Sequence, residues 1–280
     1  MIWELRQEFK VTLLIDIAGI PRSTYYYHIK HRTDEDKYKE VKKEISNIFL
    51  ENKGRYGYRR ITKELHNQNY VINHKTVMRL MKELGLVCKV RMKKYHSYKG
   101  EAGKIAPNLL DRDFSTEKPN EKWVTDVTEF SLFGQKLYLS PIPDLYSGDI
   151  VSYTIYDRPV LSMVTEMLKP AFQKIPDGTN LILHSDQGWQ YQHRHYQKML
   201  KDKGIRQSMS RKGNCLDNAV MENFFGLLKT ELLYLQKFDS LAQFRTELEE
   251  YLDYYNNRRI KLKLKGLTPA QHRSQAFLVA

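Results

Sequence analysis

The sequence predicts a mixed α/β domain preceded by a small all-helical region, and three observations support this fold class. Residues 121–256 alternate short segments rich in β-branched and aromatic residues with longer segments of helical apolar periodicity. Residues 34–87 place their apolar residues mainly at helical steps of three or four. Charge divides the chain as well: residues 1–120 hold 25 Lys and Arg against 15 Asp and Glu, whereas residues 121–280 hold 21 against 18. We therefore expect binding and chemistry to be divided between the two halves.

Residues 1–33 are predicted to form an N-terminal helical hairpin. In the stretch LLIDIAGIPRSTYYYHIK, Gly19 interrupts an apolar helix and Ser23 is placed to cap a second helix. This pair fits a helix-turn-helix that contacts DNA, and an ordinary helical hairpin is the alternative.

Residues 34–87 are predicted to form a helix-turn-helix DNA-binding domain. An amphipathic helix is expected over 34–52, a short helix begins near Ile61, and Asn73 can cap the helix that follows. The last helix has an apolar stripe with basic residues beside it, which is the layout of a recognition helix. A solvated charged face is the alternative interpretation. We expect DNA contacts from five basic residues of this domain: Arg59, Arg60, Lys75, Arg79 and Lys82.

Residues 88–120 are predicted to be a basic linker. The stretch CKVRMKKYHSYKGEAGK lacks periodicity and interleaves basic residues with Tyr95, His96 and Tyr98. This composition is typical of a segment that follows a phosphate backbone.

Residues 121–280 are predicted to form the α/β domain with C-terminal helices. Strands are expected in WVTDVTEF, KLYLSPIPDLYS, DIVSYTIYDRP, LILHSD and IRQSMS, with a turn at Ser147-Gly148. Helices are expected over 161–175, 193–203, 217–235 and 240–256.

Three acidic residues in this domain are candidates for a metal site: Asp126, Asp186 and Glu222. Asp126 lies on the first strand, and Asp186 lies at the carboxyl end of a short buried strand, where open α/β sheets place their sites. Glu222 belongs to a helix, and Lys229 shares its face at about 100° per residue. Three carboxylates that converge in a strongly basic protein suggest Mg²⁺ held against a DNA phosphate.

Two other polar groups near these acids have competing interpretations. The run His184-Ser185-Asp186 suggests a Ser-His-Asp catalytic group, but no nucleophile-elbow motif surrounds it, so we expect His184 to be structural. Arg211 and Lys212 belong to a polar loop before the Glu222 helix, which is either a DNA contact or an ordinary solvated loop.

Composition restricts the remaining function classes. The formal net charge of +13 and a pI near 9.4 favour a polyanionic partner such as nucleic acid, although a merely basic protein is the alternative. Cys88 and Cys215 form neither a disulfide framework nor a CxxC metal pair, which fits a reducing cytosol. No apolar run approaches the ~20 residues of a membrane span, and the N-terminus is too acidic for a signal peptide. We therefore expect a cytoplasmic protein with no membrane partner.

The stretches WVTDVTEF, ILHSDQGWQY, MSRKGNCLDNAVMENFFGLLKTEL and YNNRRI…LKGLTPAQ resemble the DDE transposases of bacterial insertion sequences. Within these, the chain is similar to the retroviral-integrase-like group, whose transposase is read across two overlapping frames. The resemblance covers nearly the whole chain, including GRYGYRRI…INHKTVMRLMKELGL, and implies a ribonuclease-H-like catalytic fold. It also implies that Asp126, Asp186 and Glu222 are the catalytic, metal-binding triad, with Lys229 as the basic residue beside it. One departure is RRIKLKLKGLTP, where relatives often have a His-Ser-rich segment.

The resemblance implies a DNA transposase that performs metal-dependent strand cleavage and strand transfer at insertion-sequence ends, with two Mg²⁺ ions or Mn²⁺ as a substitute. The implied partners are double-stranded DNA (terminal repeats and target), further copies of the chain in a synaptic complex, and an upstream-frame product. The chain starts at MIWEL without a long heptad run, which favours a second-frame product. Two alternatives are a DNA-binding regulatory partner of a fused transposase, inactive alone, and a nuclease without strand transfer.

Overall fold

The first three helices are short. The computed structural model describes residues 2–30, 36–88, 105–211 and 215–279. It begins with α1 (Ile2–Leu5), α2 (Val11–Ala18) and α3 (Arg22–Lys30). The predicted break at Gly19 is confirmed, since this residue ends α2 in the left-handed region at a φ of 63°. The predicted cap at Ser23 is wrong, because α3 already begins at Arg22 and the Pro21 carbonyl accepts the Tyr25 N–H.

The second helical region consists of α4 (Lys39–Glu51), α5 (Tyr58–Asn67) and α6 (His74–Glu83). Asn73 caps α6 as predicted, since its side chain accepts a hydrogen bond from the Lys75 backbone N–H at 2.8 Å. The apolar stripe of α6 is buried, through Val77, Leu80 and Met81. The helices therefore follow from apolar periodicity and one polar cap.

The α/β domain is built on two three-stranded sheets that meet along one segment of chain. One is antiparallel, in the order β2 (Thr128–Leu132), β3 (Gln135–Pro143) and β4 (Ile150–Tyr156). The other is parallel, in the order β1 (Lys122–Val124), β5 (Ile182–Ser185) and β6 (Arg206–Met209). The single strand expected over 123–130 is therefore two strands with different partners.

Thr125 joins the two sheets at the point where the strand changes partner. Its backbone N–H donates to the His184 carbonyl at 2.9 Å, and its hydroxyl donates to the Pro141 carbonyl at 2.9 Å. An isolated bridge between Trp123 and Asp144 adds a second connection. Because the backbone turns from one sheet to the other here, the next residue, Asp126, lies at the junction between them.

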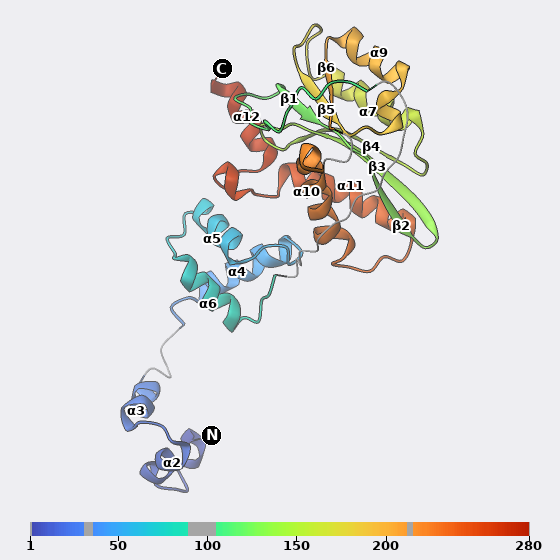
Figure 1. Cartoon of the computed structure of the whole chain (residues 1–280). Helices are drawn as coiled ribbons and strands as arrows, with labels where there is room; N and C mark the ends of the chain where they lie inside the picture. The colour runs from blue at the N-terminus through green and yellow to red at the C-terminus, as the bar shows by residue number, and fades with distance from the viewer. Residues whose placement is uncertain (1, 31–35, 89–104, 212–214, 280) are drawn as a thin grey trace.

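Helices cover both faces of this sheet assembly (Figure 1). One face carries α7 (Leu161–Phe172), α8 (Trp189–Gln192) and α9 (Arg194–Lys203). The other carries the run η1 (Cys215–Asn218), α10 (Ala219–Leu228), η2 (Lys229–Leu233) and then α11 (Leu241–Asn257). The chain ends with η3 (Leu262–Leu264) and α12 (Pro269–Val279). None of the described helices is long and apolar enough to cross a membrane.

Two hydrophobic cores follow from this layering. The core beneath α7 and α9 includes Trp123 and Leu183. The larger core on the opposite face runs without interruption from α10 and α11 into α4–α6, from Phe224 and Tyr255 to Ile45 and Leu80. The second helical region is thus packed directly on α10 and α11 of the α/β domain. The expected phosphate-following stretch of the linker, residues 89–104, lies outside the described residues.

Candidate active site

Asp126 occupies the junction between the two sheets. The side chain is half-buried, and Oδ1 accepts the Val127 N–H at 2.7 Å. Burial and the charge of the neighbouring Asp186 carboxylate raise the pKa of Asp126 well above its usual range, and Glu222 adds a smaller contribution. The structure therefore brings the three predicted acids within electrostatic reach of one another at Asp126.

Asp186 follows the last residue of β5, at the carboxyl end of a parallel strand as predicted. Its Oδ1 atom accepts the Gly188 N–H at 2.9 Å, which fixes the carboxylate against the turn into α8. Burial raises the pKa of Asp186.

Glu222 and Lys229 lie seven residues apart on α10 and the start of η2. Burial raises the pKa of Glu222. Burial lowers the pKa of Lys229, while the carboxylates of Asp126 and Glu129 oppose this shift. Because Asp126 interacts with both residues, the predicted shared face of this helix is directed towards the acids.

Asn218, the last residue of η1, contacts the Asp126 carboxylate directly. Its amide donates to Asp126 Oδ2 at 2.9 Å, and its own buried Oδ1 atom has no hydrogen-bond partner among the described residues. An amide donor stabilises the charged form of the carboxylate that burial and repulsion destabilise. No local motif in the sequence predicts this contact, because 92 positions separate the two residues.

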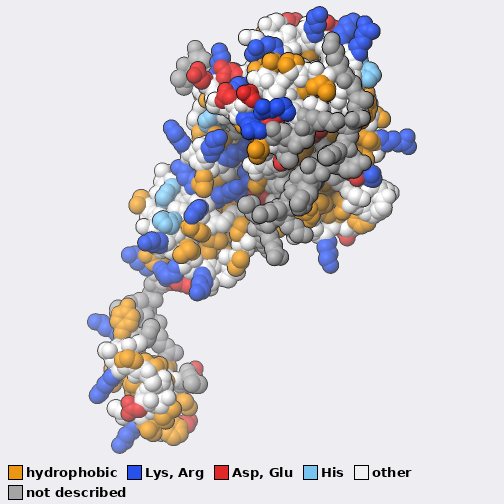
Figure 2. Space-filling model, in the orientation of Figure 1, with side chains coloured by type: hydrophobic (Ala, Val, Ile, Leu, Met, Phe, Trp, Pro, Cys, Tyr) orange, Lys and Arg blue, Asp and Glu red, His pale blue; other side chains and the backbone are white. Residues whose placement is uncertain are grey.

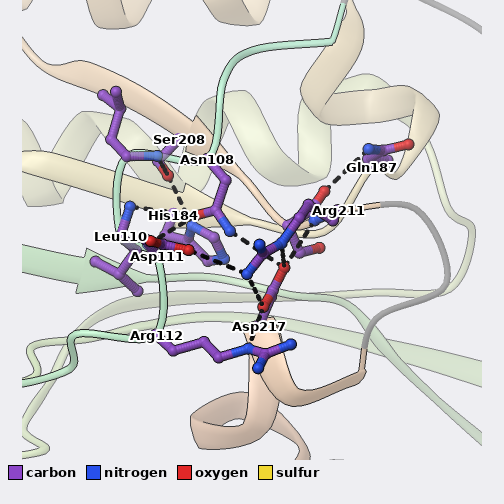
Figure 3. A network of polar contacts seen from close by, with 11 residues as sticks. Asn108, Leu110, Asp111, Arg112, His184, Gln187, Ser208, Arg211 and Asp217 are labelled. Carbon is purple, nitrogen blue, oxygen red and sulfur yellow. Dashed lines mark hydrogen bonds and ion pairs between the residues drawn. The ribbon is translucent and has the colours of Figure 1, made fainter.

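Asp217, the residue before Asn218, is held by a dense network of polar contacts (Figure 3). The fully buried carboxylate pairs with Arg211 at 2.9 Å and Arg112 at 3.0 Å, and it accepts the Asn108 amide at 3.1 Å. The Arg211 hydrogen bond holds the pKa of Asp217 below its usual range, against the opposing effect of burial. The segments that contain Asn108, Arg112 and Arg211 are thereby held to Asp217, the residue that precedes Asn218.

His184 has the structural role expected for it. The ring is fully buried, and Nδ1 lies 2.8 Å from the hydroxyl of the equally buried Ser208. Burial lowers the pKa of His184, which favours the neutral ring. The adjacent Ser185 hydroxyl donates to the Asp186 backbone carbonyl instead of to His184, so the neighbouring residues do not form a nucleophile–base pair.

The three acids lie near one another, but their carboxylates are farther apart than the ligands of a single metal ion. Within the described ranges, no three Asp, Glu, His or Cys side chains stand close enough to hold one metal ion. The raised pKa values of all three acids reflect desolvation and, at Asp126, mutual repulsion. A hard cation would relieve both effects, and the donor set is entirely oxygen, so the residues fit a divalent metal such as Mg²⁺.

The predicted DNA-contact residues fall into three groups. Lys75, Arg79 and Lys82 are exposed on α6, as is Arg59 at the start of α5. Arg60 and Arg211 are engaged within the protein, with Glu231 at 3.5 Å and with Asp217. Lys212 lies outside the described residues.

Glu231 is the polar residue that sequence reasoning missed most completely. It is 1% exposed and forms a bidentate ion pair with Arg259, through hydrogen bonds of 2.8 and 2.6 Å. The only hint in the sequence is its position in LLKTELL, two residues after Lys229, where a charged residue stands among leucines that belong to the core.

Comparison with known proteins defines the class. Models of the integrase core domain match residues 116–215 and 222–277, and a model of an HTH-like domain matches residues 35–94. The matched ranges cover the sheets, the parts of α10 and η2 that carry Glu222 and Lys229, and α4–α6. The protein is therefore an integrase-core protein with an HTH-like domain, which confirms the predicted fold class.

Relatives narrow the class to a family. The chain is 55% identical over 275 residues to "Putative transposase InsK for insertion sequence element IS150" of Escherichia coli K12, covering 98% of this chain and 97% of that protein. It is 32% identical to "Transposase InsF for insertion sequence IS3A" of the same organism, covering 94% of each. The chain belongs to the transposases of bacterial insertion sequences, whose function is DNA transposition, and as a class it is a polynucleotidyl transferase.

One solved structure among those similar to this chain is the HTLV-2 integrase catalytic core domain in complex with magnesium. It is 22% identical, with a TM-score of 0.43, and the match covers 56% of this chain and 97% of that one.

Proposed function

We propose that Asp126, Asp186 and Glu222 hold the divalent metal ions with which this transposase cleaves and joins DNA. The observation that carries the proposal is the position of Asp126. Asp126 lies where the chain passes from one sheet to the other, and the charge of Asp186 contributes to the raised pKa of Asp126. A carboxylate kept at such a site against desolvation and repulsion calls for a compensating cation.

The chain would use two Mg²⁺ ions, with Mn²⁺ as a substitute. When bound, such ions activate the attacking oxygen and stabilise the leaving oxygen of a phosphoryl transfer. Asp126 and Asp186 would supply ligands from the sheet, and Glu222 would supply one from α10. Hydrogen bonds from Val127, Gly188 and Asn218 orient the two aspartates for this role.

The reaction proceeds in two phosphoryl transfers. In the first, a water oxygen attacks the phosphorus at the element end, the P–O3′ bond breaks, and the departing 3′-oxygen takes a proton. In the second, that 3′-hydroxyl attacks a target phosphodiester, so one P–O bond forms while another breaks. Because the number of phosphodiester bonds is unchanged in the second step, no external energy source is needed. Lys229, which interacts electrostatically with Asp126, would present its amine to a phosphate there.

The proposed DNA partners are the terminal repeats of the element and the target duplex. The exposed basic side chains of α6, Lys75, Arg79 and Lys82, support insertion of this helix into a major groove. We also propose a synaptic complex that contains several copies of the chain, together with an upstream-frame product.

The test is a cleavage and joining assay on the element's own ends, with Mg²⁺ or Mn²⁺, in the presence and absence of the upstream-frame product. Asp126→Asn, Asp186→Asn and Glu222→Gln should each abolish cleavage and joining while retaining DNA affinity within about threefold. Strand transfer by any of these variants at the wild-type rate would overturn the assignment. Cleavage without joining by the wild-type chain would favour a plain nuclease.

A further inference from the structure

Helix α5 and the segment Arg258–Gly266 lie side by side although they are about 200 residues apart in the chain. The Asn67 amide on the last turn of α5 donates to the Gly266 carbonyl at 3.2 Å. The Lys63 side chain crosses Gly266 so closely that a Cβ atom there would collide with it. Gly266 also has a φ of 86°, a conformation that favours glycine. The contact is therefore specific.

This junction concentrates positive charge. Residues 58–67 and 258–266 together contain eight Lys and Arg residues but only one acidic residue, Glu64. The Oε2 atom of Glu64 is buried. We call this region the α5–η3 basic surface. Its accessible basic residues are Arg59, Arg60, Lys63, Arg258, Lys261, Lys263 and Lys265, whereas Arg259 is buried.

Only part of this charge is neutralised within the protein. Arg60 and Arg259 pair with Glu231, and Arg258 pairs with Asp253. In the parts of the chain that the structure describes, the remaining members of the surface have no ion pair with a carboxylate: Arg59, Lys63, Lys261, Lys263 and Lys265. Lys263 and Lys265 are exposed, so their charges face solvent.

The like charges act on one another. The Lys261 amine lies 3.4 Å from the carbonyls of Ser147 and Gly148, in a half-buried position. Burial, together with the positive charges of Arg259, Lys263 and Arg60, lowers the pKa of Lys261 to about 7. Positive potential that the fold leaves uncompensated is characteristic of a surface that receives a polyanion.

We propose that the α5–η3 basic surface binds the phosphate backbone of a DNA duplex, across the contact between the HTH-like region and the C-terminal segment. The proposal rests on the DNA transposase function above and extends it to three lysines outside the recognition helix: Lys63, Lys263 and Lys265. Figure 2 shows Lys and Arg side chains gathered on the face where the α4–α6 region meets the rest of the molecule. A duplex bound there would contact both regions at once, which would fix the DNA relative to the catalytic helix.

The test is the salt dependence of duplex binding by the full chain. The variant is Lys263→Gln with Lys265→Gln, both exposed. The matched control is Lys198→Gln with Lys201→Gln, two exposed lysines on α9, on the opposite side of the sheet. Each lost phosphate contact reduces the slope of log K against log salt by about 0.9, so the variant should lose up to about 1.8 and the control none. Lys63→Gln should lose up to about 0.9 from the other side of the junction.

Two results would overturn this inference, and they have different meanings. If wild-type protein binds and cleaves duplex ends but both variants keep the control's slope, the α5–η3 basic surface is only a solvated face and the transposase assignment stands. If wild-type protein shows no salt-dependent duplex binding at all, the proposed function fails and the inference fails with it. Circular dichroism spectra equal to wild type confirm that each variant is folded.

Discussion

The ion pair between Glu231 and Arg259 provides the sharpest stability prediction. Glu231 is 1% exposed and Arg259 is 2% exposed, and two hydrogen bonds of 2.8 and 2.6 Å join them. The Tyr251 hydroxyl donates to the same carboxylate at 3.0 Å. Arg60 approaches it from α5 at 3.5 Å, and Arg55 donates to the Glu231 backbone carbonyl at 2.8 Å. The carboxylate thus connects the HTH-like region, the α10–η2 helical run and the C-terminal segment.

Glu231→Leu should destabilise the protein by about 3–5 kcal/mol, because it leaves the Arg259 guanidinium buried without a counter-charge. Arg259→Met should destabilise it less, since Arg60 and Tyr251 still contact the remaining carboxylate. The double variant replaces the ion pair with an apolar pair of similar bulk, which is often nearly neutral. We therefore expect the double variant to recover about 2 kcal/mol or more relative to the sum of the single variants.

Urea unfolding followed by circular dichroism measures these differences in the free energy of unfolding. In thermal unfolding, each 1 kcal/mol should move Tm by about 2–4 °C. Burial acts against ionisation, but the hydrogen bonds and charge of Arg259 hold the pKa of Glu231 below its usual value of 4.5. The stabilisation is therefore complete above that value and is lost as pH falls through the lower, folded-state pKa. A Glu231→Leu variant within 1 kcal/mol of wild type at pH 7, or strict additivity in the double variant, would refute the reasoning.

Three further predictions concern the acids and the front helices. Asp126→Asn should raise the Tm of metal-free protein at pH 7, by about 2–4 °C for each 1 kcal/mol relieved. The reason is that the raised folded-state pKa of Asp126 makes the ionised group destabilising as pH increases. A lower Tm of the variant in EDTA would contradict this, and added Mg²⁺ should stabilise wild type only. Asn218→Ala removes the donor to Asp126 Oδ2 and should lower kcat for end cleavage by about tenfold with an unchanged KM for DNA, whereas a change in KM alone would assign Asn218 to substrate binding. Asn73→Ala removes the α6 cap and should cost about 1 kcal/mol in urea unfolding, most of which Asn73→Ser should restore.

The fold was largely predictable because its elements depend on local pattern. Apolar periodicity located α4–α6, and β-branched runs located β3–β6, with boundaries that differ from the observed ones by only a few residues. The single strand expected over 123–130 is wrong for a non-local reason. The change of pairing partner at Thr125 depends on β5, which begins more than 50 residues further along the chain and belongs to a different sheet from β2 and β3.

The polar contacts around the acids were less predictable, because they depend on segments that folding brings together. Asp217 meets Arg112 from more than a hundred residues upstream, and no local motif announces the pairing. Glu231 meets Arg259 and Arg60, which come from opposite ends of the chain. Individual acids with a specific sequence context can be identified from the chain, whereas the partners that orient them require the tertiary structure.

A single helical run joins the proposed metal site to the contact between the HTH-like region and the C-terminal segment. Glu222 on α10 and Glu231 on η2 are nine residues apart, about 13 Å along a helix at 1.5 Å per residue. At about 100° per residue they would point to opposite sides, so one carboxylate can face Asp126 while the other faces α5 and Arg259. Glu231 itself lies within the π-helical turn Lys229–Leu233, and such turns frequently occur at functional sites. On the proposed function, displacement of the HTH-like region would therefore act on the helical run that carries Glu222, and DNA bound by α6 or by the α5–η3 basic surface would be linked to the acids through it.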